Sequence, residues 1–369
     1  MRPGRGGHGA IGNATRLGID DYLLCSMVVY CFGRRSSSHS CGEGFLNAAI
    51  IVTYRCNARC QMCNIWQYPT KPEEEFPPEL LKKLPNGLGS INITGGEPAL
   101  RKDLAEIVDV LSPKTRRVEI STNGYFTDRL VEAARRHPEI TIRISTEGLP
   151  ETNDRVRGIK NGFDHAMRSY LRLRELGVKD LGFAVTIQDS NKDDLIDLFH
   201  LADHLGAEFA QAVPHNSYYF HKFDNEIADV EGVQTAIKSL IEALLKSRRP
   251  KQWARAYLNR GLVDHVAGRA RRLPCTAGTD LFFVDPSGEV YPCNGHDWSM
   301  GNLNDASFDE IWNGPEAKRV RELVTSCDAG CWMTGTAVPA MGRRLPSVAW
   351  WVLRNKLRVL RGLPVDLAD

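Results

Sequence analysis

Three cysteines lie close together early in the chain, and their spacing restricts the possible class of protein more than any other feature. Cys56, Cys60 and Cys63 have the spacing C-x3-C-x2-C and follow directly on an apolar run, residues 46–54. Three thiolates can bind three irons of a cubane [4Fe–4S] cluster and leave the fourth iron open, and a catalytic metal site needs such an open position. A zinc site lacking one ligand, or three buried cysteines, remain alternatives at this point.

Six short apolar runs alternate with segments of helical spacing over residues 46–214. Runs rich in Ile, Val, Phe and Thr are typical of buried strands, and this alternation predicts βαβ units with a parallel sheet. We expect an α/β fold, a partial (β/α)6 TIM-like barrel with functional residues at the carboxyl ends of its strands. The predicted strands are residues 46–54, 90–94, 117–121, 141–145, 181–187 and 208–213.

The chain changes character after residue 220. Residues 233–258 have helical spacing broken near Pro250, and residues 282–291 form two apolar runs around an Asp-Pro-Ser-Gly turn, which predicts a hairpin. Four thiolates complete a cubane cluster without an open iron, which suits electron transfer, although structural zinc is the alternative. The four cysteines of this region are Cys275, Cys293, Cys327 and Cys331.

A glycine-rich turn ends the second predicted strand. It consists of Gly95, Gly96, Glu97 and Pro98. The glycines allow a close approach of backbone to a ligand, and Glu97 can accept hydrogen bonds from an ammonium group. A tight strand-to-helix connection is the structural alternative. In a parallel sheet, this turn and the three-cysteine loop lie at the same end.

The three-cysteine loop followed by this turn resembles the radical S-adenosylmethionine (AdoMet) superfamily. The resemblance implies that Cys56, Cys60 and Cys63 bind the site cluster and that Gly95 to Pro98 recognise the methionine amino group of AdoMet. It implies further that the cluster passes an electron to AdoMet, and that a 5′-deoxyadenosyl radical then takes a hydrogen atom from the substrate. The protein holds these groups in line and excludes water.

Two later segments extend the resemblance. Ser145, Glu147 and Arg157 lie in a segment similar to one that reads Ser-x-Asp-Gly and then His-Asp-x-x-Arg in the subgroup with auxiliary clusters. By resemblance Ser145 contacts the ribose side of AdoMet and Arg157 its carboxylate, while Ser121 and Asn123 line the pocket. Glu147 replaces the usual Asp, and Asn153 replaces the usual His.

The late cysteines resemble a shortened auxiliary-cluster domain, called a twitch domain, rather than the longer SPASM domain with about seven cysteines. We therefore expect one auxiliary [4Fe–4S] cluster on Cys275, Cys293, Cys327 and Cys331. We expect five regions along the chain. They are a partly disordered extension (1–44), the barrel (45–225), a helical linker (226–270), the auxiliary-cluster domain (271–335) and a basic amphipathic tail (336–369).

Composition limits the class of protein. The 369 residues include 42% hydrophobic ones, enough for a large core, and 47 basic minus 45 acidic residues give a net charge of +2, which argues against a nucleic-acid binder. No apolar run reaches the roughly 18 residues of a membrane span. The ten cysteines are too sparse for a disulfide scaffold. We expect a cytoplasmic enzyme, with Cys25, Cys31 and Cys41 as incidental thiols.

The substrate and partners are less constrained. We expect oxidative modification of a small-molecule or peptide substrate, with an external electron donor such as flavodoxin or ferredoxin. A ribosomal-peptide maturase that forms thioether or C–C links is one alternative; a non-catalytic iron–sulfur electron carrier or a zinc-binding module is another. His215, Tyr218 and His221 lie near the expected barrel mouth, with packing or surface roles as the default. The helix predicted over residues 350–361 caps its own domain or makes weak membrane-surface contact.

Overall fold

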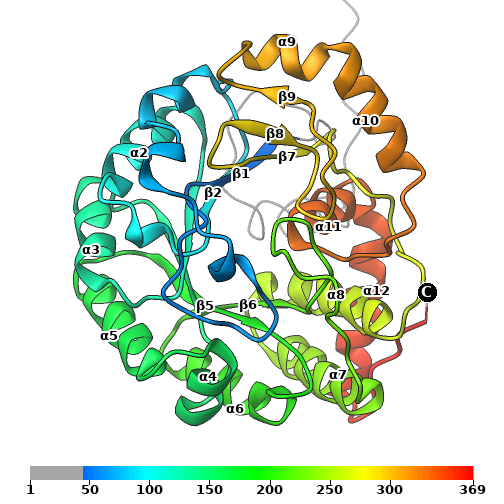
Figure 1. Cartoon of the computed structure of the whole chain (residues 1–369). Helices are drawn as coiled ribbons and strands as arrows, with labels where there is room; N and C mark the ends of the chain where they lie inside the picture. The colour runs from blue at the N-terminus through cyan, green and yellow to red at the C-terminus, as the bar shows by residue number, and fades with distance from the viewer. Residues whose placement is uncertain (1–44, 369) are drawn as a thin grey trace, which may run out of the picture.

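A nine-stranded sheet organises the chain, and the computed structural model describes residues 45–368 (Figure 1). The strand order is β6-β5-β4-β3-β2-β1-β7-β8-β9, and the first six strands are parallel. All six strands predicted from the sequence are present, so the parallel barrel prediction is confirmed. The strands are β1 (Asn47–Ile51), β2 (Ile91–Thr94), β3 (Val118–Thr122), β4 (Thr141–Ser145), β5 (Asp180–Thr186), β6 (Glu208–Ala212), β7 (Leu281–Val284), β8 (Glu289–Tyr291) and β9 (Gly301–Asn302).

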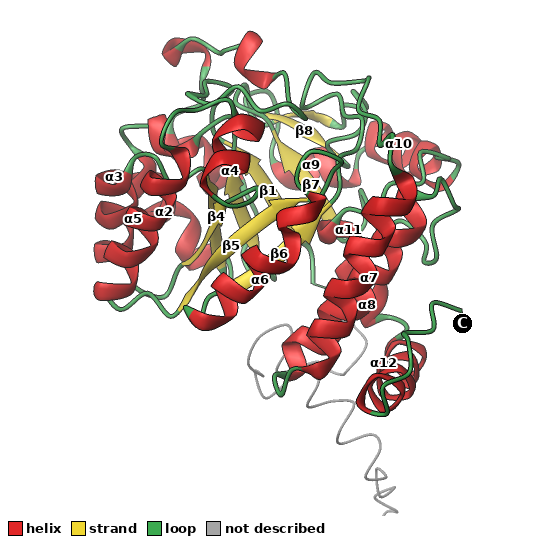
Figure 2. Cartoon of the chain, turned by 90° about the horizontal axis from the view of Figure 1, so that it is seen from below, coloured by secondary structure: helices red, strands yellow, loops and turns green. Residues whose placement is uncertain are grey.

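Helices follow the strands and cover the outside of the curved sheet (Figures 1 and 2). The first crossover, from β1 to β2, contains only 3-10 turns: η1 (Ile65–Gln67), η2 (Pro72–Glu74) and η3 (Pro78–Lys83). The α-helices are α2 (Leu104–Leu111), α3 (Thr127–Arg136), α4 (Pro150–Arg157), α5 (Gly162–Glu175), α6 (Leu195–His204), α7 (Val230–Lys246), α8 (Pro250–Val266), α9 (Phe308–Asn313), α10 (Pro315–Thr325), α11 (Thr334–Gly342) and α12 (Leu345–Leu360). Three more 3-10 turns are η4 (Pro98–Leu100), η5 (Ser112–Lys114) and η6 (Lys192–Asp194).

Strand β1 shows why apolar runs without alternation form this sheet. Ile50 belongs to the large core between the sheet and the outer helices, whereas Ala49 and Ile51 belong to a second apolar cluster inside the barrel. Successive side chains of a strand point to opposite faces, so a strand buried on both faces needs apolar residues at nearly every position. The predicted break at Pro250 is also confirmed, because Pro250 begins α8, where its missing N–H costs no hydrogen bond.

The predicted hairpin forms, but it joins the barrel sheet. Strands β7 and β8 are antiparallel, and β7 pairs in parallel with β1, with Phe282 opposite Ala48. The cysteine-rich region therefore continues the same sheet. The division of the chain into five regions stays a prediction. The first of these regions, residues 1–44 with Cys25, Cys31 and Cys41, lies outside the described residues. Between residues 45 and 368, no helix combines the length and the apolar character needed to cross a membrane.

Candidate active site

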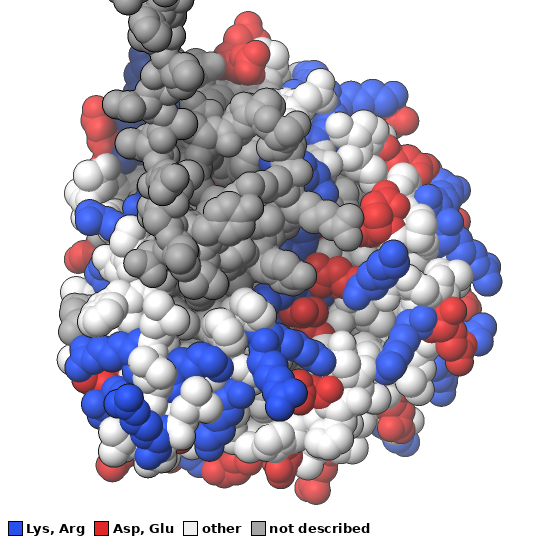
Figure 3. All heavy atoms as spheres, turned by 180° about the vertical axis from the view of Figure 1, so that it is seen from behind, with Lys and Arg blue, Asp and Glu red and all other residues white. Residues whose placement is uncertain are grey.

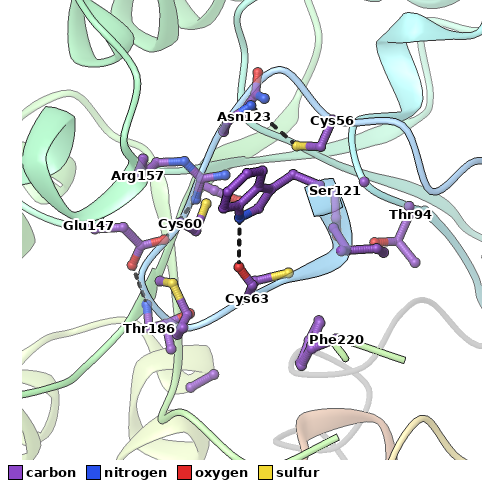
Figure 4. A pocket seen from close by; sticks show the side chains of 18 of the residues that line it. Cys56, Cys60, Cys63, Thr94, Ser121, Asn123, Glu147, Arg157, Thr186 and Phe220 are labelled. Carbon is purple, nitrogen blue, oxygen red and sulfur yellow. Dashed lines mark hydrogen bonds and ion pairs between the residues drawn. The ribbon is translucent and has the colours of Figure 1, made fainter. Parts of the chain in front are cut away.

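A cavity lies where the parallel strands end (Figure 4). The last residue of each of the strands β2 to β6 lines it. Of the residues predicted from the sequence, the three cysteines of the early loop also line it, together with Gly95, Gly96, Ser121, Asn123, Ser145, Glu147 and Arg157. Glu97 and Pro98 do not line it. The topology thus gathers residues from six consecutive strand ends around one space, as expected for a parallel barrel.

The three-cysteine loop is held by two neighbouring segments. The N–H of Arg59 donates to the carbonyl of Arg157 (2.9 Å) at the end of α4, and the N–H of Asn64 donates to the carbonyl of Phe220 (2.9 Å). Gly158, in the left-handed conformation (φ +57°), makes the first contact possible, because a Cβ there would lie 2.6 Å from the carbonyl oxygen of Arg59. The loop is therefore positioned by tertiary contacts on both sides.

The glycines of the Gly-Gly-Glu-Pro turn allow it to lie against the end of β1. The N–H of Gly96 donates to the carbonyl of Thr53 (2.7 Å), and the N–H of Glu97 to that of Arg55 (2.8 Å). A Cβ at Gly96 would lie 2.2 Å from the carbonyl oxygen of Arg55. Only glycine fits at this position, so the turn fixes the relative position of the cysteine loop and the end of β2.

The carboxylate of Glu97 faces the protein interior. Its side chain has no exposed surface, and it accepts hydrogen bonds from Thr122 Oγ1 (2.6 Å) and from the N–H groups of Asn123 (2.7 Å) and Ala99 (3.0 Å). Burial raises the pKa of this carboxyl, and these hydrogen bonds oppose that rise. In this structure Glu97 ties the end of β3 to the turn, so its role toward an ammonium group stays a prediction.

Glu147 and Arg157 form a buried ion pair (2.8 Å) beside the cysteine loop (Figure 4). The other Glu147 oxygen accepts the N–H of Thr186 (2.7 Å) on β5. Burial alone would lower the pKa of Arg157, but the thiols of Cys60 and Cys56 and the Glu147 carboxylate outweigh it, and the pKa is raised. A permanent positive charge thus faces the cysteines.

The cysteine thiols lie in a largely apolar environment. Burial raises the pKa of Cys56 and of Cys63 to about 12 and also raises that of Cys60. Buried thiols are poor nucleophiles, whereas metal coordination displaces their protons. The donor set therefore suits metal ligation better than thiol catalysis.

Sequence reasoning missed Tyr219 as a site residue and left His215 with a packing role. Both line the cavity. The hydroxyl of Tyr219 donates to the carbonyl of Gly95 (2.6 Å), and burial lowers the pKa of His215 to about 4, so its imidazole is neutral. No local pattern marks either residue, because the loop that carries them reaches the site only when the barrel curls.

The segment after β8 joins this cavity to the late cysteines. The N–H groups of Tyr218 and Tyr219 donate to the carbonyls of Gly295 (3.2 Å) and Asn294 (3.1 Å). Cys293 belongs to the apolar cluster inside the barrel, against which Cys56 and Cys63 also pack. One late cysteine and two cysteines of the early loop therefore pack in the same apolar cluster.

The four late cysteines lie near one another. Burial raises the pKa of Cys293 to about 12, with the thiols of Cys331 and Cys275 adding to the rise. Burial likewise raises the pKa of Cys331 to about 11, and Cys275 and Cys327 contribute. The sulfur of Cys327 lies 3.4 Å from Nε2 of His296. That the four residues form one ligand set stays a prediction.

Unsatisfied polar groups indicate that the cavity is built for a ligand. Arg157 and His215 line the cavity, and the Nε of Arg157 and the Nε2 of His215 are buried without a hydrogen-bond partner among the described residues. No three His, Cys, Asp or Glu side chains in residues 45–368 converge closely enough to hold a single metal ion. A cubane cluster spreads its ligands over several irons, so wider spacing is compatible with it. The residues present fit AdoMet and a three-cysteine cluster.

Comparison with known proteins identifies the family. Residues 50–202 match the model of the radical SAM superfamily, and residues 275–332 match that of the SPASM iron-sulfur cluster-binding domain. The chain is 32% identical over 295 residues to Fe-coproporphyrin III synthase of Methanosarcina barkeri, an alignment that covers 71% of this chain and 72% of that protein. The chain belongs to the radical SAM superfamily. It is an enzyme of this superfamily, and its cofactors are AdoMet and [4Fe–4S] clusters, as predicted.

Other similar proteins include peptide maturases. The sporulation killing factor maturation protein SkfB of Bacillus subtilis is 26% identical, covering 77% of this chain and 67% of that protein. Two solved structures have the same fold. They are anSMEcpe with bound AdoMet (TM-score 0.56, 14% identity, 84% of this chain and 99% of that one) and Streptococcus suis SuiB (TM-score 0.58, 16% identity, 78% and 73%).

Proposed function

We propose that this radical SAM enzyme oxidises a small-molecule or peptide substrate in the cavity at the strand ends, with one auxiliary cluster on the late cysteines. One observation carries the proposal: the three buried thiols, the glycine turn and Arg157 line a single cavity. When bound there, the site cluster and AdoMet supply a 5′-deoxyadenosyl radical that takes a hydrogen atom from the substrate.

The residues that line the cavity bind AdoMet and orient it toward the substrate. Arg157 is assigned to the AdoMet carboxylate, because its Nε is buried without a partner among the described residues while Nη1 is held by Glu147. Ser145, Ser121 and Asn123 are assigned to the polar groups of the rest of AdoMet. The apolar part of the wall, including Trp66 and Phe220, excludes water and faces the substrate.

The late cysteines, as ligands of the auxiliary cluster, are assigned to the step that follows removal of the hydrogen atom. A substrate that has lost a hydrogen atom must lose one electron and one proton to become a closed-shell oxidised product. Of the late cysteines, Cys293 packs in the same apolar cluster as Cys56 and Cys63, which suits electron acceptance. A pKa of about 4 makes the neutral imidazole of His215 a weak base near neutral pH, so His215 is not assigned as the proton acceptor. A flavodoxin or ferredoxin in a reducing cytoplasm would supply the electron that starts each turnover.

The substrate class has two candidates. The similarity to Fe-coproporphyrin III synthase, together with Trp66, Tyr219 and Phe220 on the cavity wall, favours a small molecule. The similarity to SkfB, a maturation protein by name, favours a ribosomal-peptide maturase that forms thioether or C–C links as the second candidate.

An anaerobic reconstitution tests the proposal. We expect about eight irons per chain, four for each cubane cluster, and slow formation of 5′-deoxyadenosine when dithionite and AdoMet are added. Cys56→Ala should abolish this AdoMet cleavage. Cys275→Ala should reduce the iron content to about four and leave slow AdoMet cleavage, which depends only on the first cluster. Cys25→Ala, outside both ligand sets, serves as the matched control and should change neither.

Two outcomes would contradict the proposal. A fully iron-loaded protein that never cleaves AdoMet would be an electron carrier. Zinc in place of iron at the late cysteines, with the first cluster intact, would replace the auxiliary redox role by a structural one.

A further inference from the structure

The C-terminal helix α12 uses one face to pack on the protein. Its residues Val348, Trp351 and Val352 are buried, and the ring of Trp351 meets that of Tyr257 on α8 edge-on, with 5.5 Å between centroids. Figure 2 shows α7, α8 and α12 beside the sheet. This packing buries the side of the helix that faces the protein.

A second apolar face of α12 is exposed to solvent. Trp350, Leu353, Leu357 and Leu360 are spaced by three, four and three residues, so they form one stripe along the helix. Their exposed fractions are 68%, 50%, 55% and 62%. Ten large hydrophobic side chains are exposed among the described residues, and these four are the longest contiguous set of them. We call this set the α12 stripe.

Basic residues border the α12 stripe. From Arg343 to Arg361 the chain has six basic and no acidic residues. Two of the six pair with carboxylates outside this segment, Arg343 with Asp280 and Arg354 with Asp366. Lys356 Nζ donates to the carbonyls of Leu245 (2.7 Å) and Ser247 (3.0 Å), and so holds the turn between α7 and α8 against α12. That turn adds three exposed basic side chains: Lys246, Arg248 and Arg249. Lys and Arg side chains gather on the lower left of the surface in Figure 3.

The combination of apolar and basic side chains on the α12 stripe and its border indicates which kind of partner it binds. Exposed leucines and a tryptophan bordered by arginines match the two layers of a bilayer surface, acyl chains beneath anionic headgroups. A second copy of the same face would bring arginine against arginine, which opposes a symmetric dimer. We propose that the α12 stripe and its basic border dock the enzyme on the surface of a membrane that contains anionic lipids.

The docking surface is separate from the cavity. No residue of α12 lines the described cavity, whose walls come from the strand ends and the loops that follow them. Substitutions in the stripe therefore leave the cysteines and the AdoMet-binding residues in place. The inference does not depend on the proposed reaction.

Vesicle co-sedimentation of the reconstituted full chain tests this proposal. The probes are vesicles of phosphatidylcholine alone and of phosphatidylcholine mixed with phosphatidylglycerol at about 3:1. We expect binding to the anionic vesicles at least about tenfold stronger than to the neutral ones, and weaker binding at about 0.5 M NaCl. Leu353→Ser with Leu357→Ser should reduce binding to anionic vesicles at least about tenfold. The matched control is Leu171→Ser, a leucine 47% exposed on α5, which should bind like the wild type.

A charge-reversal pair isolates the basic border. Arg248→Glu with Arg361→Glu should weaken binding to the anionic vesicles, whereas Arg135→Glu, exposed on α3, should not. Three results would overturn the proposal: absence of wild-type binding to either vesicle, equal binding by the stripe variant and the wild type, or a dimer in light scattering that Leu353→Ser with Leu357→Ser converts to a monomer. The last result would assign the stripe to a second copy of the chain.

Discussion

The hydroxyl of Tyr219 donates a hydrogen bond to the backbone carbonyl of Gly95, 2.6 Å away. This bond joins the loop after β6 to the glycine turn after β2, two segments at separate positions around the cavity. The same tyrosine also donates its N–H to Asn294, beside Cys293. Tyr219 therefore links the cavity wall to the segment that carries an auxiliary cysteine.

Tyr219→Phe should weaken AdoMet binding by about three- to tenfold, since one hydrogen bond contributes about 0.5–1.5 kcal/mol. Equilibrium binding of AdoMet to the reconstituted protein measures this. Tyr170→Phe is the matched control, because that buried hydroxyl donates to the carbonyl of Leu205 (2.9 Å), away from the cavity. Equal losses of affinity in both variants would show that the effect is only structural.

Arg157→Lys should reduce AdoMet affinity by about tenfold or more, because lysine keeps the charge but lacks the second and third nitrogens of the guanidinium. The same assay measures it. Arg143→Lys, at a buried arginine that pairs with Asp180 (2.5 Å), should lower thermal stability and leave AdoMet affinity unchanged. Wild-type affinity in Arg157→Lys, together with wild-type affinity in Arg157→Ala, would remove the assignment of Arg157 to AdoMet.

Gly96→Ala should prevent AdoMet binding, because the new methyl group would overlap the carbonyl of Arg55 and push the turn away from the cysteine loop. AdoMet titration and thermal unfolding measure the change. Gly342→Ala has open space around its Cβ, so it should leave both properties within the small range expected for a tolerated glycine substitution. Normal AdoMet binding by Gly96→Ala would contradict the close contact between the glycine turn and Arg55.

Asp180→Asn should destabilise the protein by about 1–3 kcal/mol at pH 7. The ion pair of Asp180 with Arg143 is only partly buried, so solvent screens part of its energy. Burial raises the pKa of Asp180, but Arg143, Arg117 and Lys251 outweigh it and lower the pKa below its usual range. The stabilisation is therefore present above the unfolded-state value of about 4 and is lost as the pH falls below it.

Urea unfolding at a series of pH values measures this effect. The difference between wild type and Asp180→Asn should be constant near neutrality and shrink in acid. Asp109→Asn, at an exposed carboxylate paired with Arg136 (2.7 Å), should cost much less. A difference that grows in acid would refute a lowered pKa for Asp180.

The strands and the cysteine loop were predictable because their determinants are local. Residues 48–52 are apolar throughout because both faces of β1 are buried. The three cysteines predicted to bind the site cluster lie within eight residues of chain, so their spacing alone is enough for the prediction. The Gly-Gly pair was predictable for the same reason, because a close backbone approach requires glycine wherever it occurs.

Other features depend on contacts between distant residues. The pairing of Phe282 on β7 with Ala48 on β1 makes the hairpin part of the barrel sheet, and no local pattern records this choice of partner strand. The inward orientation of Glu97 depends on Thr122 and Asn123, on the next strand along. His215 and Tyr219 reach the cavity only through the curvature of the sheet.

Local patterns were enough to predict the family and the parallel strands and to propose the cluster-binding cysteines, because spacing and periodicity act over a few neighbouring residues. Three features emerge only in the folded chain. Cys293 packs in the same apolar cluster as Cys56 and Cys63, Tyr219 joins the glycine turn to the segment beside Cys293, and α12 has an exposed apolar face. These depend on which surfaces meet when the chain closes, and burial of an apolar side chain is a property of its neighbours in space.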